Sequence, residues 1–260
     1  MKSDKIRQFL VVFVIVSTIV MNYLSNALPI GGQTNAEVSD KHFTSFTPAG
    51  FAFSIWGVIY LGLIGFAVYQ ALPSQRTNPR FRAVGPLVML NGLFNSLWLV
   101  VFQNEWLFVS VLFIAGILYT LFGINLGLRL NVPNIPTAEQ WLARVPFGLY
   151  FGWVTVATIA NICVWLESTG WIGWGISGPV WAQILIIAGL TIGLFVFSRI
   201  RSFSYLLVFV WAYAAIAAGQ EGNGSVPLVA TIAASIAAIV WLLSYFQRPK
   251  SPSHPTPSFW

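Results

Sequence analysis

The sequence predicts an all-α fold: a polytopic membrane bundle of eight transmembrane helices with both termini on the cytoplasmic side. Three observations lead to this prediction. Of the 260 residues, 57% are hydrophobic and only 8% are charged, whereas a soluble domain carries about 25% charged residues. The mean hydropathy is +0.77. Apolar runs long enough to cross about 30 Å of hydrocarbon as helix recur along the chain, and they lack the two-residue alternation of a membrane β-barrel.

Five apolar runs fill the first two thirds of the chain, at residues 8–24, 49–72, 83–103, 107–128 and 143–164. The first run follows the basic segment Met1–Arg7, and Ser25-Asn26-Ala27 after it resembles a signal-peptidase site. Cleavage there is an alternative that would leave seven spans. The polar connection 25–47 is long enough to fold over the outer mouth of the bundle, and Pro48 is suited to open the second helix.

Three further spans are predicted at residues 176–198, 203–219 and 226–246. Small residues recur along them at helical spacing: Gly189 and Gly193, then Ala214, Ala215, Ala217 and Ala218, then Ala230, Ala234 and Ala238. Such residues let helices approach closely, here against the first five spans or against a second copy of the chain in a homodimer. Residues 248–260 are rich in Pro and Ser and are predicted to form a disordered cytoplasmic tail.

The charged residues support this topology. With the amino terminus inside, all but one of the 13 basic residues fall in cytoplasmic segments, and Lys41 is the exception. Five acids lie in outer segments: Glu37, Asp40, Glu105, Glu167 and Glu221. This distribution follows the positive-inside rule, so the net charge of +6 indicates contact with anionic lipid rather than with nucleic acid. No charged residue lies in mid-span, which argues against ion-coupled transport.

Disulfide and metal chemistry find little support in the sequence. The single cysteine, Cys163, lies within a predicted span, and the two histidines, His42 and His254, are far apart in the chain. No disulfide framework, metal site or covalent cofactor is therefore expected.

Three predicted helices each carry aromatic and amide side chains on one face. The stripes are Phe53, Trp56 and Tyr60; Asn91, Asn95, Trp98 and Phe102; and Tyr150, Trp153, Ala157, Asn161 and Trp165. Residues three and four apart share a helix face. An amide in hydrocarbon needs a partner, so the asparagines should face inward. Three inward stripes predict a binding cavity in the outer half of the first five helices.

Each stripe also has a plainer interpretation. The asparagines could join helices to one another, at about 0.6–2 kcal/mol per hydrogen bond. Trp165 lies near the outer end of its span, where tryptophan often anchors a helix at the membrane interface. Tyr60 and Tyr150 could bind a ligand carboxylate or each other, and Trp211, outside the stripes, is expected to serve helix packing.

The stripes carry a resemblance to a known family. Pro48 to Tyr60, PAGFAFSIWGVIY, resembles the second-helix signature of the TspO/translocator protein family. Asn95-Ser96-Leu97-Trp98 with Phe102 is similar to the family's third-helix pattern, and Tyr150 to Trp165 to its fifth-helix pattern. The resemblance covers residues 10–167. It implies a long member of the tryptophan-rich sensory protein type, with a five-helix unit at 1–167 and three added spans at 168–247.

The resemblance also implies a function and a location. Family members bind tetrapyrroles such as protoporphyrin IX and haem as non-covalent ligands, in a pocket capped by the first loop, and a bacterial plasma membrane is the expected location. Sterol binding is not expected, because Ile162 and Leu166-Glu167 replace the sterol-linked residues. The first outer loop lacks the family's Trp-Tyr and Lys-Pro motif, and Leu149 replaces a Pro.

Three functions remain open from the sequence. In the first, a binding or signalling protein stacks a planar ligand on Trp56, Trp98 and Trp165. In the second, a porphyrin-degrading enzyme uses light, with Trp56 and Trp165 as the redox-active residues that the resemblance implies. The third is a transporter of a neutral or amphipathic metabolite, a function that the number of predicted spans suggests.

Overall fold

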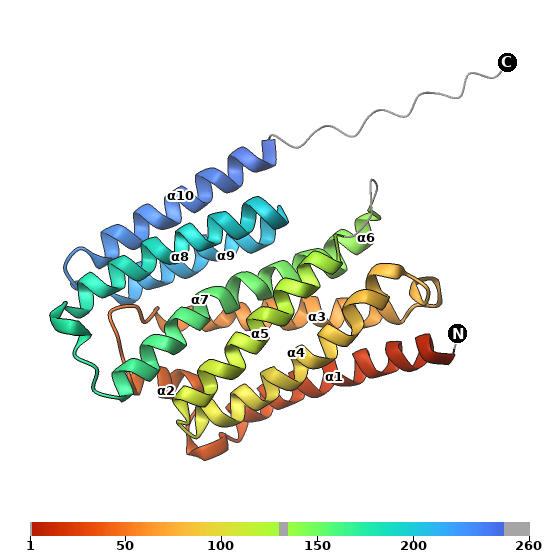
Figure 1. The fold of residues 1–260 in the computed structure, drawn as a ribbon, viewed down its shortest axis with the longest axis horizontal. Helices are drawn as coiled ribbons and strands as arrows, with labels where there is room; N and C mark the ends of the chain where they lie inside the picture. Colours follow the sequence, from red (N-terminus) through yellow and green to blue (C-terminus); the bar gives the residue numbers. More distant parts are fainter. Residues whose placement is uncertain (1, 130–134, 247–260) are drawn as a thin grey trace.

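The computed structural model describes residues 2–129 and 135–246, apart from the side chain of Tyr245, and in these residues all regular structure is helical (Figure 1). Every predicted span corresponds to one long helix. These helices are α1 (Lys2–Ala27), α3 (Ile55–Ala71), α4 (Pro79–Gln103), α5 (Leu107–Gly127), α7 (Val145–Ser168), α8 (Gly178–Ile200), α9 (Phe203–Gly219) and α10 (Val226–Phe246). The predicted tail, residues 248–260, lies outside the described residues.

Seven helical stretches of the described residues are long and apolar enough to cross a membrane, which indicates an integral membrane protein. The exception is α9, whose 17 residues extend about 25 Å, short of the ~30 Å of hydrocarbon. α9 contacts α7, α8 and α10 and buries residues along most of its length. Neighbouring helices therefore shield much of it.

Several helices extend a few residues beyond the predicted spans, and two spans open with a turn that was not predicted. The second span does not open as α-helix at Pro48: it begins with the 3₁₀ turn η2 (Gly50–Ser54), and α3 follows. The fifth span starts earlier, with the short helix α6 (Thr137–Glu139) and the π-helical turn η4 (Gln140–Arg144) ahead of α7. Pro146, at the start of α7, lacks the N–H that a regular helix needs, which explains a wider turn just before it.

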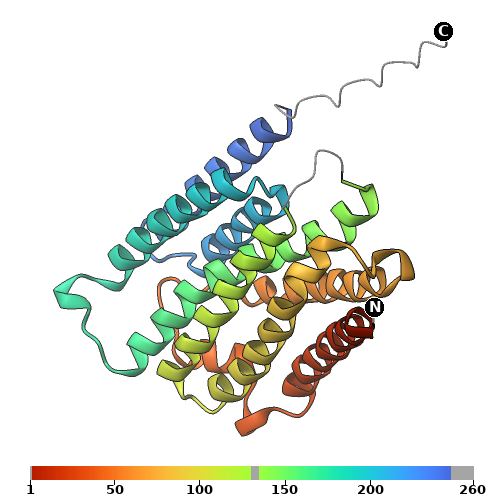
Figure 2. The ribbon, with the colours of Figure 1, turned by 45° about the vertical axis from the view of Figure 1, so that its right-hand side comes forward.

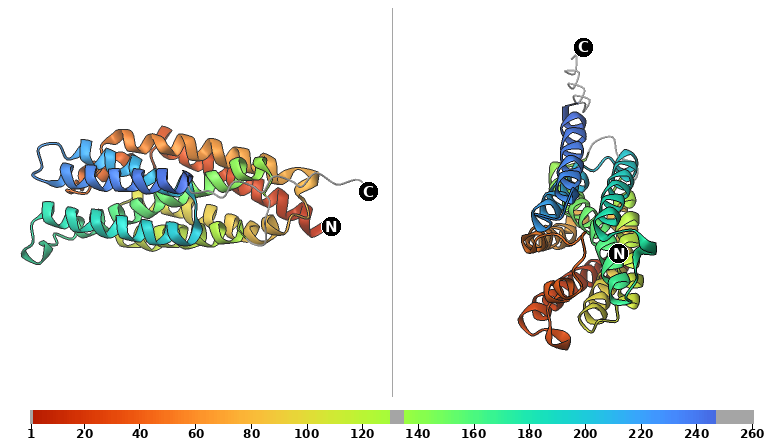
Figure 3. Two further views of the ribbon diagram at one scale, coloured as in Figure 1. Left: turned by 90° about the horizontal axis from the view of Figure 1, so that it is seen from above. Right: turned by 90° about the vertical axis from the view of Figure 1, so that its left-hand side faces the viewer.

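The long helices run roughly along one direction, and the start of α1 lies at the same end of the bundle as the end of α10 (Figures 1 and 3). α4 packs between α1 and α5, and α3 packs against α1 and α7. α8, α9 and α10 form a group that joins the rest mainly through α7 and also through η2 (Figure 2). α7 is thus the central helix of the molecule.

The glycines of α8 make their close contact inside the chain. Gly189 faces the Tyr213 hydroxyl, and a Cβ on Gly193 would meet the Phe209 ring at 2.5 Å. Both partners lie on α9. The predicted close approach therefore occurs between helices of one chain.

Ion pairs lie at both ends of the bundle. At the end where α1 begins, Arg82 pairs with Asp4 at 2.7 Å and Arg80 pairs with Glu139 at 2.5 Å. At the opposite end, Glu105 accepts from Lys41 and lies 3.0 Å from His42 Nε2. These partners are distant in sequence, yet each pair joins residues that the charge distribution assigns to one side of the membrane.

Candidate functional site

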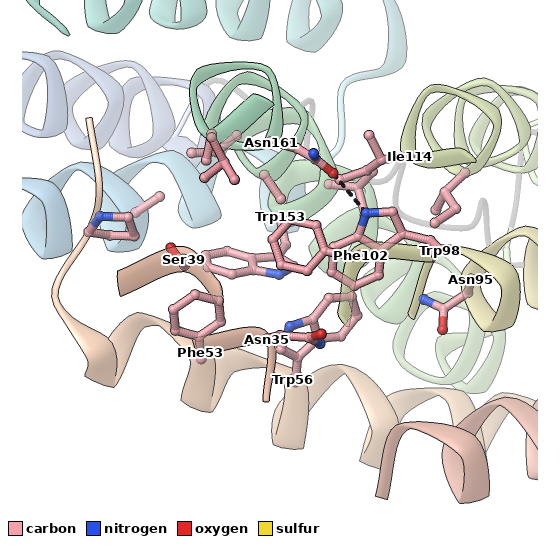
Figure 4. A pocket seen from close by; sticks show the side chains of 18 of the residues that line it. Asn35, Ser39, Phe53, Trp56, Asn95, Trp98, Phe102, Ile114, Trp153 and Asn161 are labelled. Carbon is pink, nitrogen blue, oxygen red and sulfur yellow. Dashed lines mark hydrogen bonds between the residues drawn. The ribbon is translucent and has the colours of Figure 1, made fainter. Parts of the chain in front are cut away.

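A cavity lies among α3, α4, α5 and α7, beneath residues 28–54, which we call the lid segment. Its volume is about 60 Å³. Eight of the twelve residues predicted from the stripes line it: Phe53, Trp56, Asn95, Trp98, Phe102, Trp153, Ala157 and Asn161. Figure 4 shows the rings of Trp56, Trp98 and Trp153 gathered from three helices. The three stripes therefore converge on one space.

The other four predicted residues do not line this cavity. Tyr60 stacks on Trp56, with ring centroids 5.5 Å apart, and Tyr150 meets the same indole edge-on at 5.7 Å. Asn91 donates to Thr120 of α5. Trp165 packs against Phe108, half-buried, so the expected group of Trp56, Trp98 and Trp165 does not form.

Trp153 lies where the three stripes meet. Its indole meets the Trp56 ring edge-on at 6.3 Å and the Phe53 ring at 6.0 Å. Across the cavity, Trp98 and Phe102 stack nearly parallel at 5.0 Å. Edge-to-face and offset contacts of this kind are the preferred arrangements of aromatic rings. These ring contacts pack the walls of the cavity together through apolar surface.

The three asparagines bind other protein groups. Asn161 accepts from Trp98 Nε1 at 2.8 Å and donates to Ser110 Oγ at 2.8 Å. Asn95 accepts from Asn22 and donates to the Tyr150 hydroxyl, each at 2.8 Å. These bonds join α1, α4, α5 and α7. The three side-chain amides therefore form hydrogen bonds between helices, with the carbonyl, the N–H or both bound to another protein group.

Two polar atoms of the cavity lining have no hydrogen-bond partner among the described residues: Trp153 Nε1 and Asn35 Oδ1. Trp153 is 3% exposed. A buried donor or acceptor left without a partner costs about 1–3 kcal/mol, so such atoms are rare in native structures. One donor and one acceptor in the same cavity are suited to the polar groups of a ligand.

The lid segment supplies lining residues that the stripes did not include. The short helix α2 (Asn35–Lys41) contributes Asn35 and Ser39, and Phe46 and Pro48 follow. α2 begins with a capping box, in which Thr34 and Glu37 bond each other's backbone N–H. That Thr-x-x-Glu pattern is visible in the sequence and could have located α2. Its inward face could not be chosen, because seven residues give too short a pattern.

Contacts from both sides tie the lid segment to the bundle. On α9, the Ala215 carbonyl accepts from the Ala49 N–H at 2.9 Å, and Trp211 Nε1 donates to the Ala52 carbonyl at 3.1 Å. Gln220 Nε2, just beyond α9, donates to the carbonyls of Thr44 and Thr47. Trp211 therefore has a more specific contact than the general packing expected from sequence.

Glu105 binds the other side of the lid segment. It lies between α4 and α5 and accepts hydrogen bonds from Lys41 Nζ at 2.5 Å and Gln33 Nε2 at 2.7 Å, while His42 lies within 3.0 Å. These contacts, the one with Lys41 above all, lower the pKa of the Glu105 carboxyl to about 2. The carboxylate is thus ionised at any physiological pH.

A larger cavity of about 670 Å³ adjoins the first. It lies between the lid segment, α7 and the start of α8, with Ile159, Trp171 and Trp181 among its lining residues. Phe46 lines both cavities. Phe46 therefore lies at the boundary between a small aromatic chamber and a wider one.

The small cavity has no charged side chain in its described lining. Among the residues that the structure describes, no three His, Cys, Asp or Glu side chains come together to hold a metal ion. Acid–base chemistry needs a titratable group within reach of the substrate. The arrangement is therefore suited to binding an apolar, aromatic molecule.

Comparison with known proteins assigns the chain to a family. The sequence model of a family described as TSPO-like protein matches residues 8–246. The chain belongs to the TSPO-like protein family. The match confirms the resemblance seen in the stripes. No curated protein and no solved structure matches the chain.

The TSPO-like match extends beyond residues 10–167, where the motifs were found, and reaches the end of α10. It includes the lid segment, the stripes and α9, which contributes Ala212 to the cavity wall. This TSPO-like protein is therefore matched over all eight long helices.

Proposed function

We propose that this TSPO-like protein is a ligand-binding, translocator-like membrane protein that holds a planar, largely apolar molecule in the aromatic cavity. A tetrapyrrole such as protoporphyrin IX or haem is the proposed ligand. The observation that carries the proposal is the convergence of Trp56, Trp98 and Trp153 on one space that also contains an unpartnered donor and acceptor. Aromatic walls with a few placed polar groups are typical of small-molecule sites.

The two unpartnered atoms give the ligand its orientation. Trp153 Nε1 would donate to an acceptor on the ligand, such as a carboxylate, while Asn35 Oδ1 would accept from a ring N–H. The faces of Trp56 and Trp98 would supply van der Waals contact with the macrocycle. Binding would then satisfy both polar atoms as it buries apolar surface.

The lid segment must move to admit such a molecule. A cavity of about 60 Å³ is far below the ~300–1,000 Å³ that drug-sized ligands occupy. If the Phe46 side chain turns aside, the aromatic chamber joins the adjacent cavity of about 670 Å³. We propose that the ligand occupies both spaces, with Phe46 displaced.

The test is a titration of the purified full-length chain with protoporphyrin IX, followed by the absorption of the porphyrin. Trp153→Phe keeps an aromatic ring but removes the indole N–H, so we expect affinity to fall about fivefold to thirtyfold, as for a lost hydrogen bond. Trp165→Phe is the matched control, since Trp165 lies outside the cavity lining. Equal losses in both variants, or no binding by the parent chain, would refute the proposed site.

The same material separates binding from degradation. Illuminating the complex and measuring new porphyrin products by mass spectrometry tests for the enzyme. The mechanism inferred from the resemblance needs Trp56 and Trp165 together, yet Trp165 packs on Phe108 outside the cavity. We therefore expect no product that depends on the protein.

We further propose that all eight long helices cross a bacterial plasma membrane, with both termini cytoplasmic. The distribution of basic residues supports this orientation. In a Cys163→Ser background, an impermeant maleimide should label Asp40→Cys in intact spheroplasts. Lys5→Cys should react only after the membrane is disrupted, and the reverse pattern would invert the topology.

A further inference from the structure

Four arginines line a polar cavity at the end of the bundle where α1 begins. The cavity measures about 310 Å³ and lies between the end of α5, the π-helical turn η4 and the connection from α8 to α9. Arg129 lies just after α5 and Arg144 in η4, whereas Arg199 and Arg201 lie at the end of α8 and just after it. Gln140 and Ser202 complete its polar wall.

The positive charges of this cavity lack a counter-charge in the part of the chain that the structure describes. No carboxylate is among the lining residues, and no ion pair involves any of the four arginines. The neighbouring acid, Glu139, has both carboxylate oxygens bound by Arg80. The Glu139 charge still acts on Arg144 from outside the cavity, but no anion lies among the described residues that line the cavity with the four guanidinium groups.

Two of the guanidinium groups are held in place by backbone carbonyls. Arg129 Nη1 donates to the Asn125 carbonyl and Arg144 Nη2 donates to the Leu128 carbonyl. These bonds leave other N–H groups of both side chains unused, and Arg144 Nε is buried without a partner among the described residues. Burial, together with the nearby Arg144 charge, lowers the pKa of Arg129 to about 10. The pair is thus preorganised rather than freely mobile.

The connection from α8 to α9 also favours an anion. Arg201 ends α8 with a left-handed backbone, φ 49°, a conformation that usually requires glycine. α9 begins two residues later, and its N-cap Ser202 makes no capping hydrogen bond with its side chain. A helix amino terminus attracts negative charge. The turn therefore directs both a helix terminus and two arginines to the same place.

We propose that these four arginines bind a phosphate group. The guanidinium fork matches two phosphate oxygens, and several such forks around one cavity provide the charge that a phosphate needs. The group can come from an anionic phospholipid, since the site lies at the ends of α5 and α8, where headgroups are expected. It can also come from free phosphate in solution. Basic pockets between membrane helices take up lipid headgroups in this way.

The test compares two double variants of the full-length chain. Arg199→Gln with Arg201→Gln removes two exposed cavity charges that hold no other element in place. Lys2→Gln with Lys5→Gln removes two exposed charges at the same end of the bundle, outside the cavity lining. One arm titrates phosphatidylglycerol against phosphatidylcholine in detergent by native mass spectrometry. The other titrates inorganic phosphate by calorimetry.

We expect the arginine variant to bind phosphatidylglycerol about 25-fold more weakly, about fivefold per arginine, and the lysine variant to match the parent chain. The same loss confined to inorganic phosphate would also support the site and identify free phosphate as the source. Binding as tight as that of the parent chain, by both variants and in both arms, would overturn the proposal. So would equal losses, because the effect would then be one of net charge. Unchanged helical content by circular dichroism excludes unfolding as the cause.

Discussion

At the scale of single residues, the polar atoms of the aromatic cavity are of two kinds: those bonded to another helix and those without a partner among the described residues. The Trp98 indole N–H is occupied by Asn161, whereas the Trp153 indole N–H has no partner among the described residues. Two tryptophans on neighbouring helices thus have different roles, although each carries the same indole group. The first joins two helices, and the second is the donor that we propose for a ligand.

Replacing Trp98 by Phe should therefore destabilise the protein. The change leaves the buried Asn161 carbonyl without its donor, which we expect to lower the free energy of unfolding by about 1–3 kcal/mol. Thermal unfolding in detergent, followed by circular dichroism, measures the effect. Trp165→Phe is the comparison, because the Trp165 side chain is half-buried and outside this network. Equal melting temperatures for the two variants would contradict the assigned role.

Glu105 gives a prediction about pH. Its pKa is lowered in the folded state to about 2, so its contribution to stability is present above its ordinary pKa of about 4.3. The contribution is lost as the pH falls through about 2. The amides of residues 34–42 should therefore be less protected in acid, with exchange faster than the intrinsic rate of an unfolded chain at that pH predicts for the intact contact. Glu105→Gln should show fast exchange at neutral pH too, and unchanged exchange in that variant would count against the ion pair.

At the scale of elements, α9 secures the lid segment by direct backbone contact. The Ala215 carbonyl bonds the Ala49 N–H, and Gly219 lies against the backbone of Pro48 and Ala49. A Cβ at Gly219 would lie 2.5 Å from the Ala49 nitrogen, which is closer than real Cβ atoms approach. The absence of a side chain is what lets the end of α9 meet this segment.

Gly219→Ala should displace the lid segment. Because the clashing atoms are backbone, the strain cannot be relieved by turning a side chain, and we expect faster amide exchange at residues 44–52 together with altered porphyrin affinity. Gly57→Ala is the matched control: it lies in α3 with no atom within 4 Å of the added Cβ. That variant should be neutral or stabilised by up to about 1 kcal/mol. Normal exchange in Gly219→Ala would contradict the tight contact.

At the scale of the whole molecule, one of the last three helices, α9, contributes to the candidate site. α9 supplies Ala212 to the cavity wall and binds the lid segment through Ala215 and Trp211. It also packs against α7, whose Gly152 lies against the Tyr205 carbonyl. The division at residue 167 seen in the motifs therefore crosses a continuous core.

A chain ended after Ser168 should lose the closed cavity. Without α9, the Ala49 N–H and the Ala52 carbonyl lose their partners, and the face of α7 that packs on α9 becomes exposed. We expect weaker porphyrin binding than in the full chain and a lower melting temperature. Both can be measured in the same detergent. Full affinity in the shortened chain would show that α9 is dispensable for the site.

The helices could be predicted well from the sequence because their signal is local. An apolar run of about 20 residues predicts a helix wherever it occurs, and the seventh and eighth predicted spans coincide with α9 and α10. The sequence predicted the helix starts less well where a turn precedes the helix. The 3₁₀ turn η2 precedes α3, and the π-helical turn η4 precedes α7. For the site, the sequence identified the faces of three helices, because the spacing of side chains along a helix is fixed.

The sequence by itself determined the class of protein, the order of its helices and the three stripes that converge on the cavity. Only the tertiary structure decided that Trp153 rather than Trp165 completes the aromatic group, that the amides join helices, and that α9 closes the lid segment. The physical reason is the separation along the chain of the residues that each property depends on. Hydropathy and helical spacing are properties of adjacent residues, whereas the partner of a buried N–H depends on the packing of helices distant in sequence.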